Sequence, residues 1–591
     1  YENIQKLMMD LDPNNNYIIL DFSHKIPINK AKDLNRLISD TLDNFSKFDS
    51  FMKNQMNQFF ELQIHSLGYS SKTKELTREK SEPIEMKDIN KIIKVRGINA
   101  NREVSNKENN HSLSKTSNLF YRLNNGNTLN DEANNILQET IVKVDNLLTN
   151  AYCGDENNRG IFTSVFNRVK KFGGIDSSSE LSIRSTISER DLLSNNTTLF
   201  YKQEDSLLPE TYNGLGYLNL YGMIFEIETI MVDIKKDHAN INLIYIEEPE
   251  SHTHPQLQYI FIKNIKDLIK EHFYELNQNN TKELQEIQSI ITTHSSHIVS
   301  DCNFDDLIYF KREQESVISK SFNSLGDEYK SDKLGYRFVK QYLTLSNSEL
   351  FFSDKVICIE GDTERILLAR MMQKIDREYP ITSERSITPL LSQNISIIET
   401  GAYSHVFKKL FDFLGIKVLI ITDIDTTKKE EKVDKNGNIY TVYTSCIPEE
   451  GTHISNHSIL EFFGKDNFLK DATQTQFSLI SNKTAEEKCI GNFRIAYQIP
   501  ESESGYQPAS FEDAFISLNK KFIADNKINL IKYGAIKRFS DTELNDFYVF
   551  ARSKIDKKST FASSLLYFEN ENNTWKVPKY ILEGLLWLKE Q

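Results

Sequence analysis

Short apolar segments alternate with long amphipathic segments in two separate parts of this chain. In the first part, predicted strands at residues 243–246 and 288–292 flank a predicted helix at 256–274. In the second part, the pattern predicts strands at 355–359, 395–399 and 418–421 and helices at 363–375 and 405–414. Strand–helix alternation is typical of parallel sheets covered by helices. The sequence therefore predicts an α/β fold made of two α/β units in series, with a boundary near Asn347.

The expected domains are residues 1–346 and 347–591, the latter ending in a helical region. In the first domain, apolar runs at 17–22 and 92–96 predict further strands, and residues 132–148 and 162–172 have apolar positions at helical spacing. We expect a helical insertion at about 127–205 that serves as an insertion or dimerisation element without chemistry of its own. Residues 102–117 are polar enough for a loop, and residues 311–333 look like a charged linker.

Charge and cysteine content limit the class of protein. The net charge of −13 excludes a globally basic nucleic-acid binder but allows a local basic groove. Lys408, Lys409 and Lys417 are candidates for such a groove, although an ordinary solvated helix face is the simpler interpretation. Five scattered cysteines without a CxxC pair favour a reducing cytoplasm and argue against structural zinc. No apolar run approaches the roughly 20 residues that span a membrane.

In the first part of the chain, one predicted strand ends in two acidic residues and the next is followed by a histidine. Glu247 and Glu248 follow an apolar run, at the edge where an α/β sheet presents ligands. One carboxylate there can organise Mg²⁺ and its neighbour can polarise a water for attack on a γ-phosphate. His294 follows the next strand, where it can sense that phosphate. Upstream, Gly214 and Gly216 lie in a short loop before a helix, whose backbone N–H groups can bind phosphate oxygens.

A second acidic set marks the C-terminal part. Glu360 ends a predicted strand, and Glu364 lies one turn into the helix that follows. Asp423 and Asp425 end another strand, and in extended chain such residues project to the same face. Four converging carboxylates repel one another unless divalent cations lie among them. Mg²⁺ or Mn²⁺ is the expected occupant, because both prefer oxygen ligands and can bridge phosphate.

The first acidic set resembles that of the ABC/SMC-type ATPases. NGLGYLNL, with Asn213, is similar to their signature loop, which binds ATP in trans; IYIEEPE resembles their Walker B strand and ITTHSSH their switch histidine. The resemblance implies Glu247 as a ligand of Mg²⁺, Glu248 as general base and His294 as γ-phosphate switch, and it makes zinc binding by His252 and His254 unlikely. The sequence contains no GxxxxGK[ST] loop. Either that loop lies in a segment before Tyr1, as the non-Met start favours, or this copy does not bind ATP normally.

The second set resembles the TOPRIM domain, through its E-G-x-x-E and D-x-D motifs. Together with ETGAYSHVFKKLFDFLGIKVLIITDID, THISNHSI, SFEDAF, KKSTFA and VPKYILEGLLWL, it resembles the OLD (overcoming lysogenization defect) family of ATP-dependent nucleases over about residues 205–591. In that family an ABC-type ATPase precedes a TOPRIM nuclease. The resemblance implies metal binding by Glu360, Glu364, Asp423, Asp425 and Glu512. It also implies stabilisation of the pentavalent phosphate by Lys558, for which the adjacent Lys557 is an alternative.

The expected function is an ATP-regulated, divalent-metal-dependent DNA endonuclease of two-metal mechanism, acting in the bacterial cytoplasm in defence against phage. The resemblance implies ATP and Mg²⁺ or Mn²⁺ as cofactors, and DNA and a second copy of the chain as partners. A reverse transcriptase with its DNA–RNA product, as in retrons, or a helicase-like protein, as in Gabija systems, are further partners to test. The alternative is an ATP-controlled scaffold or sensor that binds nucleic acid without cutting it.

Overall fold

The computed structural model describes most of the chain. The described residues are 4–9, 15–41, 58–70, 73–101, 131–154, 159–171, 182–187, 200–203, 206–209, 212, 214–237, 239–277, 286–380, 388–433, 438–468, 475–501 and 505–590. They divide into two compact units, residues 1–294 and 295–591. The polar loop predicted at 102–117 lies outside the described residues.

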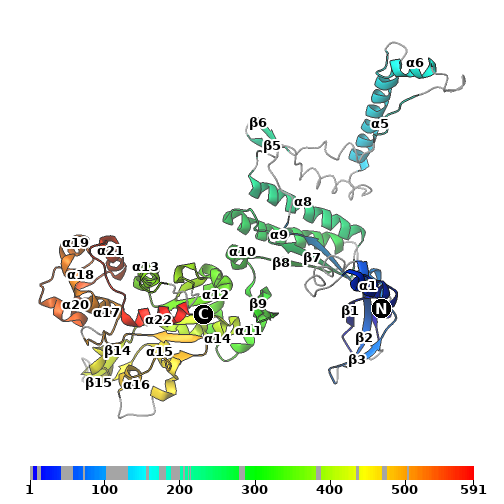
Figure 1. Ribbon diagram of the computed structural model, residues 1–591. Coiled ribbons are helices and arrows are strands. Elements are labelled where there is room, and N and C mark those ends of the chain that lie inside the picture. Colours follow the sequence, from blue (N-terminus) through cyan, green and yellow to red (C-terminus); the bar gives the residue numbers. More distant parts are fainter. Residues whose placement is uncertain are drawn as a thin grey trace. The chain divides into compact units, whose positions relative to one another are not determined.

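The described residues of the first unit form three small sheets (Figure 1). One is antiparallel, β1-β2-β3; one is parallel, β4-β7-β8; and β5 pairs with β6. Its strands are β1 (Ile19–Lys25), β2 (Glu61–Ser70), β3 (Glu75–Lys80), β4 (Ile93–Ile98), β5 (Phe200–Gln203), β6 (Ser206–Pro209), β7 (Ile241–Glu247) and β8 (Glu286–Thr292). Its helices are η1 (Gln5–Leu7), α1 (Ile28–Thr41), α3 (Met86–Asn90), α5 (Asp131–Cys153), α6 (Thr163–Lys171), α8 (Leu215–Lys236) and α9 (Pro255–Asn277).

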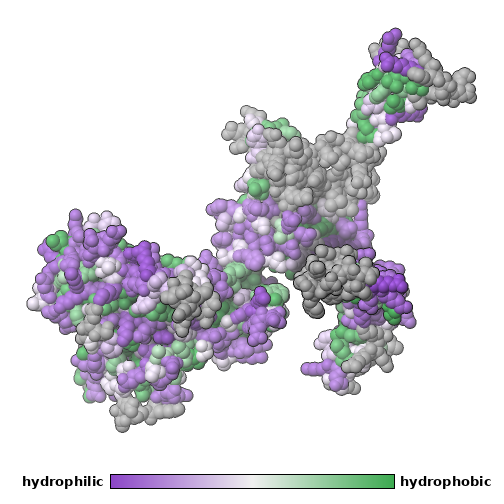
Figure 2. Space-filling model, in the orientation of Figure 1, coloured by the Kyte–Doolittle hydropathy of each residue, from purple (hydrophilic) through white to green (hydrophobic). Residues whose placement is uncertain are grey.

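Helices α5 and α6 occupy most of the described part of the predicted helical insertion. Several of their apolar side chains are exposed, as the green surface over this segment in Figure 2 shows. Ile136 and Leu147 are 61% and 68% exposed, and eleven residues are close to three helical turns, so the two share one face of α5. This apolar face suits a helix that packs against another chain.

The second unit is built around a five-stranded sheet of order β12-β11-β13-β18-β17, in which β17 is the antiparallel edge strand. Its two faces alternate along each strand. Ile357 and Leu419 pack with α13, α17, α21 and α22 in one apolar cluster, whereas Cys358 and Ile420 pack with α12, α14 and α15 in another. Helices therefore cover both faces, which explains why the central strands are continuously apolar.

The strands of this unit are β9 (Ile308–Glu313), β10 (Ser316–Ser321), β11 (Lys355–Ile359), β12 (Ile395–Glu399), β13 (Lys417–Ile421), β14 (Thr426–Val433), β15 (Ile439–Ser445), β16 (His453–Ile454), β17 (Cys489–Ile490) and β18 (Phe493–Ala496). The α-helices are α10 (Ser296–Ser300), α11 (Phe322–Glu328), α12 (Lys333–Ser346), α13 (Asp362–Glu378), α14 (Lys408–Leu414), α15 (His457–Phe463), α16 (Gln476–Ser481), α17 (Phe511–Leu518), α18 (Lys520–Asp525), α19 (Lys527–Lys532), α20 (Phe547–Lys554), α21 (Lys558–Phe568) and α22 (Lys579–Lys589). Short 3₁₀ helices are η4 (Phe304–Asp306), η5 (Ser348–Phe352), η6 (Leu390–Ser392), η7 (Gly401–Phe407), η8 (Pro448–Glu450), η9 (Lys465–Phe468) and η10 (Glu543–Asn545).

The structure confirms the α/β fold and corrects the linker predicted at 311–333. That segment lies in the β9–β10 hairpin and α11. Two lysines of the hairpin point inward, Lys311 donating to Leu414 O at 2.9 Å and Lys320 to Phe413 O at 2.7 Å, so part of the charge belongs to the fold. Phe322 and Leu325 are buried in the same cluster as the central sheet. The packing boundary at Ser295 therefore precedes the boundary that the sequence predicts near Asn347. Among the described residues, none of the helices is both long and apolar enough to span a membrane.

Candidate nuclease centre and nucleotide-binding residues

Two acidic residues follow neighbouring parallel strands of the five-stranded sheet. Glu360 follows β11 directly, and Asp423 follows β13 after Thr422. Glu360 Oε2 accepts hydrogen bonds from Thr422 Oγ1 and from the backbone N–H of Asp423, each at 2.8 Å. The carboxyl ends of adjacent parallel strands meet at one edge of a sheet, and this contact brings the two predicted carboxylates together there.

Glu364 reaches the same region from the first turn of α13. Its Oε2 accepts a hydrogen bond from Gly361 N at 3.2 Å, which satisfies a free donor at the start of the helix. The side chain is buried, with 6% of its surface exposed. Glu364 therefore caps its own helix as well as facing the other acidic residues.

Asp425 enters the cluster through a turn rather than through strand alternation. β13 ends at Ile421, and Asp425 has a φ of 50°, in the left-handed region. The turn is held by Ser455, whose backbone N–H and hydroxyl both donate to Asp425 O, at 3.0 and 2.8 Å. The sequence pattern predicts extended chain at both aspartates, but the strand ends before Asp423 and the backbone at Asp425 is left-handed.

Glu512 lies at the start of a helix. Ser510 is the N-cap residue of α17, so Glu512 lies in the first turn of this helix. The side chain of Glu512 is buried, and its Oε1 accepts a hydrogen bond from Thr363 Oγ1 at 3.3 Å. Since Thr363 belongs to the first turn of α13, this bond joins the helix starts that carry Glu512 and Glu364.

Lys558 is the first residue of α21, and Lys557 is its N-cap. Lys558 Nζ lies 3.0 Å from Glu512 Oε2, while 61% of the lysine side chain remains exposed. Burial of its inner end would lower the pKa of Lys558, but the charges of Glu512 and Asp423 outweigh burial and raise that pKa above its ordinary value. A charged ammonium group therefore borders the acidic cluster and faces solvent.

The carboxylates destabilise one another's ionised forms. Burial raises the pKa of Glu364 to about 7, and the neighbouring charges of Glu512 and Glu360 add to this effect. Burial and the other carboxylates, Glu360 first, raise the pKa of Asp423 well above its ordinary value. Burial and then Glu360 raise the pKa of Asp425 to about 6. All five predicted carboxylates thus lie close enough to form one electrostatic unit with excess negative charge.

Three polar residues that the sequence analysis did not single out hold this unit in place. Gln498 Nε2 donates to Asp423 Oδ1 at 2.6 Å, and Gln498 Oε1 accepts from Ile424 N at 3.0 Å. Asn456 Nδ2 donates to Thr422 Oγ1 and Asp423 O at 2.8 and 2.9 Å. Gln498, Asn456 and Thr422 are all buried. Gln498 lies two residues after the end of β18, and a polar residue so soon after an apolar strand is the sequence signal that could have identified it.

The donor set fits a hard divalent cation in its chemistry. Carboxylate oxygens are the ligands that Mg²⁺ and Mn²⁺ prefer, and a cation would offset the repulsion that raises these pKa values. In the described ranges, no three acidic, histidine or cysteine side chains are already arranged around one point as a metal site. Protein N–H and O–H donors contact carboxylate oxygens of Glu360, Glu364 and Asp423.

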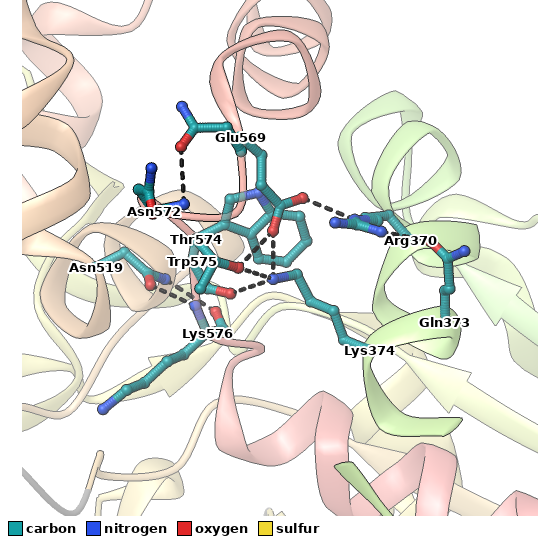
Figure 3. Close-up of polar contacts among 10 residues, drawn as sticks. Arg370, Gln373, Lys374, Asn519, Glu569, Asn572, Thr574, Trp575 and Lys576 are labelled. Carbon is teal, nitrogen blue, oxygen red and sulfur yellow. Dashed lines mark hydrogen bonds and ion pairs between the residues drawn. The ribbon is translucent and has the colours of Figure 1, made fainter. Parts of the chain in front are cut away.

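Helix α13 is fixed at its middle by a buried ion-pair network (Figure 3). Glu569, just after α21, accepts hydrogen bonds from Arg370 Nε at 2.7 Å and Thr574 Oγ1 at 2.6 Å and forms an ion pair with Lys374. Lys374 Nζ also donates to Trp575 O at 2.6 Å and lies 4.3 Å from the centroid of the Trp575 ring. The network joins the two helices whose first turns carry Glu364 and Lys558.

In the first unit, one of the two adjacent carboxylates lies next to the predicted histidine. β7 and β8 are adjacent parallel strands. Glu248, which follows β7, has a φ of 40°, and its Oε1 lies 3.6 Å from His294 Nε2. Glu247 instead accepts a hydrogen bond from Ala100 N through Oε2, at 2.9 Å, so the two neighbouring carboxylates point to different partners.

The predicted signature loop leads into α8. Gly214 is the N-cap of this helix and offers no side chain to accept its first N–H groups. A Cβ on Gly216 would lie 2.8 Å from His252 O, so only glycine permits this close approach. Asn219 Nδ2 donates to Ser251 O at 2.6 Å. The start of α8 is thereby packed on the loop after Glu248; Asn213 lies outside the described residues.

Two of the three lysines proposed for a basic groove have partners within the protein. Lys409 Nζ donates to Glu328 O at 2.6 Å, and Lys417 Nζ donates to Trp587 O and Glu590 O at 2.8 and 2.7 Å. Lys408 is exposed. The contacts of Lys409 and Lys417 favour the interpretation that these residues are structural.

Family models match the two parts of the chain in turn. A model described as "AAA ATPase domain" matches residues 9–299. A model described as "Overcoming lysogenization defect protein-like, TOPRIM domain" matches residues 351–425, which include Glu360, Glu364, Asp423 and Asp425.

Curated relatives carry nuclease names. Endonuclease GajA of Bacillus cereus (strain HuB5-5) is 28% identical over 589 residues, which cover 95% of this chain and 76% of the relative. Old nuclease of Escherichia phage P2 is 24% identical over 236 residues, 38% of this chain and 36% of the relative. OLD nuclease of Thermus scotoductus (strain ATCC 700910 / SA-01) is 23% identical over 246 residues, 41% of each protein.

Proposed function

We infer that this chain, which carries an AAA ATPase domain and an OLD-like TOPRIM domain and is homologous to the GajA and OLD nucleases, is a DNA endonuclease. The observation that carries this inference is the acidic cluster of Glu360, Glu364, Asp423, Asp425 and Glu512. Burial, together with the charges of the neighbouring carboxylates, raises the pKa values of Glu364, Asp423 and Asp425 in this cluster. Without a cation, the repulsion within this cluster lowers the stability of the fold. With bound cations, the same cluster can serve phosphodiester hydrolysis.

The five carboxylates would hold Mg²⁺ or Mn²⁺ in a two-metal arrangement. Cations bound there supply an activated water and stabilise the leaving oxygen. The chain's own residues do the rest. Lys558, charged and partly exposed beside Glu512, neutralises the phosphate group at the reacting centre. Glu360 and Asp423 keep their places through hydrogen bonds to Thr422 and Gln498.

The first unit would bind and hydrolyse ATP. Glu247 would contribute to Mg²⁺ binding, Glu248 would act as general base, and His294 would contact the γ-phosphate, as the 3.6 Å approach of His294 to Glu248 supports. The start of α8 at Gly214 and Gly216 would bind phosphate oxygens of a nucleotide held by a second copy of the chain, which the exposed apolar face of α5 supports. ATP turnover would regulate DNA cleavage.

We place this activity in the bacterial cytoplasm, in defence against phage. The resemblance to OLD-like nucleases supports this setting, and a reverse transcriptase with its DNA–RNA product or a helicase-like protein remain candidate partners. The second candidate function is an ATP-controlled scaffold that binds nucleic acid without cutting it. It is favoured by one observation, that protein donors already occupy carboxylate oxygens of Glu360, Glu364 and Asp423.

A plasmid cleavage assay separates the two candidates. The full chain is incubated with supercoiled DNA and Mg²⁺ or Mn²⁺, with and without ATP, beside Asp423→Asn and the exposed control Asp412→Asn. We expect nicking or linearisation that needs the metal and disappears in Asp423→Asn but not in Asp412→Asn. Equal cleavage by Asp423→Asn would contradict the assigned centre. No cleavage by any form, with DNA binding retained, would support the scaffold.

A further inference from the structure

Helix α21 lines a recess in addition to placing Lys558 beside the acidic cluster. A recess of about 380 Å³ runs along it, lined by Tyr533, Ser559, Thr560, Ser563, Ser564, Tyr567 and Phe568. Six of these seven residues belong to α21, which begins with Lys558. Ser559 directly follows the lysine that borders the acidic cluster, and at 1.5 Å per residue Tyr567 lies about 12 Å further along the helix.

The hydroxyl groups of the recess are available to a ligand. Within the described part of the chain, the side chains of Ser559, Thr560, Ser563 and Ser564 have no hydrogen-bond partner. Ser564 is the most informative, because it is 93% buried (7% exposed) and still lines the recess. Among the described residues, Ser564 Oγ is not one of the buried polar atoms without a partner, so this oxygen stays accessible from the recess.

The far end of the recess is aromatic. The Tyr533 ring lies 5.9 Å from that of Tyr567 and 5.4 Å from that of Phe568, between ring centroids. Tyr533 and Tyr567 are 53% and 72% exposed, so a ligand in the recess can reach both rings. Exposed aromatic rings of this kind form stacking platforms for nucleobases.

The charge around the recess suits a polyanion. None of the residues that line it is acidic, although the whole chain carries a net charge of −13. Lys558 stands at one end, and Lys532 Nζ lies 5.9 Å from the centroid of the Tyr533 ring at the other. Hydroxyl donors between two cations, beside aromatic rings, match a sugar–phosphate chain with its bases.

We propose that this recess binds one or two nucleotides of the DNA strand next to the phosphate cut beside Lys558, with a base stacked on Tyr533 and Tyr567. Ser559, Thr560 and Ser563 donate hydrogen bonds to the strand's phosphate and sugar oxygens. The inference rests on the proposed nuclease function and adds to it a contact with bases that are unstacked from the duplex. Cleavage would therefore favour DNA that is single-stranded or locally opened.

Binding without cleavage tests the recess directly. The full chain in EDTA is titrated against a fluorescein-labelled single-stranded oligonucleotide, and anisotropy gives the affinity. Tyr533→Ala and Tyr567→Ala should each weaken binding by about 5- to 100-fold, the range of base–aromatic stacking. Tyr567→Phe, which keeps the ring, and Tyr379→Ala, a similarly exposed tyrosine at the end of α13, should bind like wild type.

Abasic substitutions identify the stacked base. Oligonucleotides with one abasic position each should lose the effect of Tyr567→Ala at one or two positions only, whereas general damage to the fold would weaken all of them equally. Equal weakening at every position, or wild-type affinity in both tyrosine-to-alanine variants, overturns the inference. If the oligonucleotide does not bind to the wild-type chain, the inference also fails.

The plasmid assay distinguishes failure of the recess inference from failure of the proposed nuclease function. Wild-type cleavage of plasmid together with unchanged binding by the two alanine variants refutes the recess and leaves the nuclease intact. Position-dependent loss of binding without any cleavage refutes the nuclease and keeps the recess as a strand-binding site. Cleavage of a plasmid and of an oligonucleotide bearing a bubble, compared in wild type and Tyr567→Ala, should show the larger loss on the bubble.

Discussion

At the scale of single residues, Asp423 has the most closely defined surroundings in the candidate nuclease centre. It is buried among carboxylates, and its Oδ1 accepts hydrogen bonds from Gln498 Nε2 and Phe511 N at 2.6 and 3.1 Å. Such donors orient a metal-binding carboxylate and limit its motion. The residues around the acidic cluster therefore contribute to its geometry.

Divalent metal should stabilise the protein through this cluster. At a concentration of about 100 times Kd, Mg²⁺ or Mn²⁺ adds roughly 2.7 kcal/mol to the free energy of unfolding. Thermal unfolding with and without metal measures this shift. Glu364→Gln, which keeps the hydrogen bond to Gly361 N, should lose most of it, whereas Asp412→Asn should keep it. An undiminished shift in Glu364→Gln would place the metal elsewhere.

Gln498→Leu should reduce cleavage without unfolding the chain. The substitution keeps the side-chain volume but removes the donor to Asp423, and loss of such a partner typically costs about 10- to 100-fold in metal affinity or activity. The measurement is the cleavage rate as a function of Mg²⁺ concentration. Tyr580→Phe removes only the 3.2 Å contact between Gln498 Nε2 and Tyr580 Oη and should have a smaller effect. If both variants cleave like wild type, Gln498 does not position Asp423.

At the scale of elements, the centre depends on three helix starts, those of α13, α17 and α21. Thr363 joins the first two, and Glu512 joins the second and third. The network around Glu569 clamps α13 to the chain that follows α21 (Figure 3). Burial alone would raise the pKa of Glu569, but hydrogen bonds from Arg370, Lys374 and Thr574 outweigh it and hold this pKa below its ordinary value.

Glu569→Gln should destabilise the chain in a pH-dependent manner. A depressed pKa means that the ionised carboxylate stabilises the fold above the unfolded pKa of about 4.3, and that this stabilisation disappears as the pH falls through the folded value. At pH 7 the variant leaves Arg370 and Lys374 without their anion, at a cost of about 2 to 4 kcal/mol. Chemical denaturation should show this difference at pH 7 and its loss as the pH falls through the lowered pKa of Glu569. A difference that is constant with pH would rule out the ion pair as its origin.

At the scale of the whole molecule, each of the two α/β units carries one candidate site. The first unit presents Glu248 and His294 at the ends of adjacent strands, and the second presents the acidic cluster in the same kind of place. Parallel strands direct their carboxyl ends to one edge, which is why the candidate site residues of both units lie there.

Glu248→Gln should reduce ATP hydrolysis by about 10²- to 10⁴-fold, the contribution of a general base, and should leave ATP binding in place. His254→Ala, an exposed histidine in the same loop, should hydrolyse ATP normally. Phosphate release measures the first effect, and plasmid cleavage with ATP in the same variants measures coupling. Cleavage that responds to ATP identically in wild type and Glu248→Gln would show that hydrolysis, as distinct from binding, does not regulate the nuclease.

The sequence by itself determined the α/β fold, the order of the two units and the strand ends on which Glu248, Glu360 and Asp423 lie. These features depend on local patterns: apolar strands of limited length, helices with a 3.6-residue repeat, and acidic residues directly after a strand. The assignments of Glu512 and Lys558 came from resemblance, since neither follows a strand. The prediction of a linker at 311–333 was wrong because a short hairpin with mixed charge looks polar in sequence.

Only the tertiary structure decided how these residues meet. It showed that Asp425 reaches the cluster through a turn, that Glu512 lies on a helix and pairs with Lys558, and that Gln498 and Asn456 hold Asp423. The recess on α21 is equally invisible in sequence, because Tyr533 comes from another helix region. Long-range contacts of this kind depend on how helices pack on the sheet, and no local pattern of residues encodes that packing.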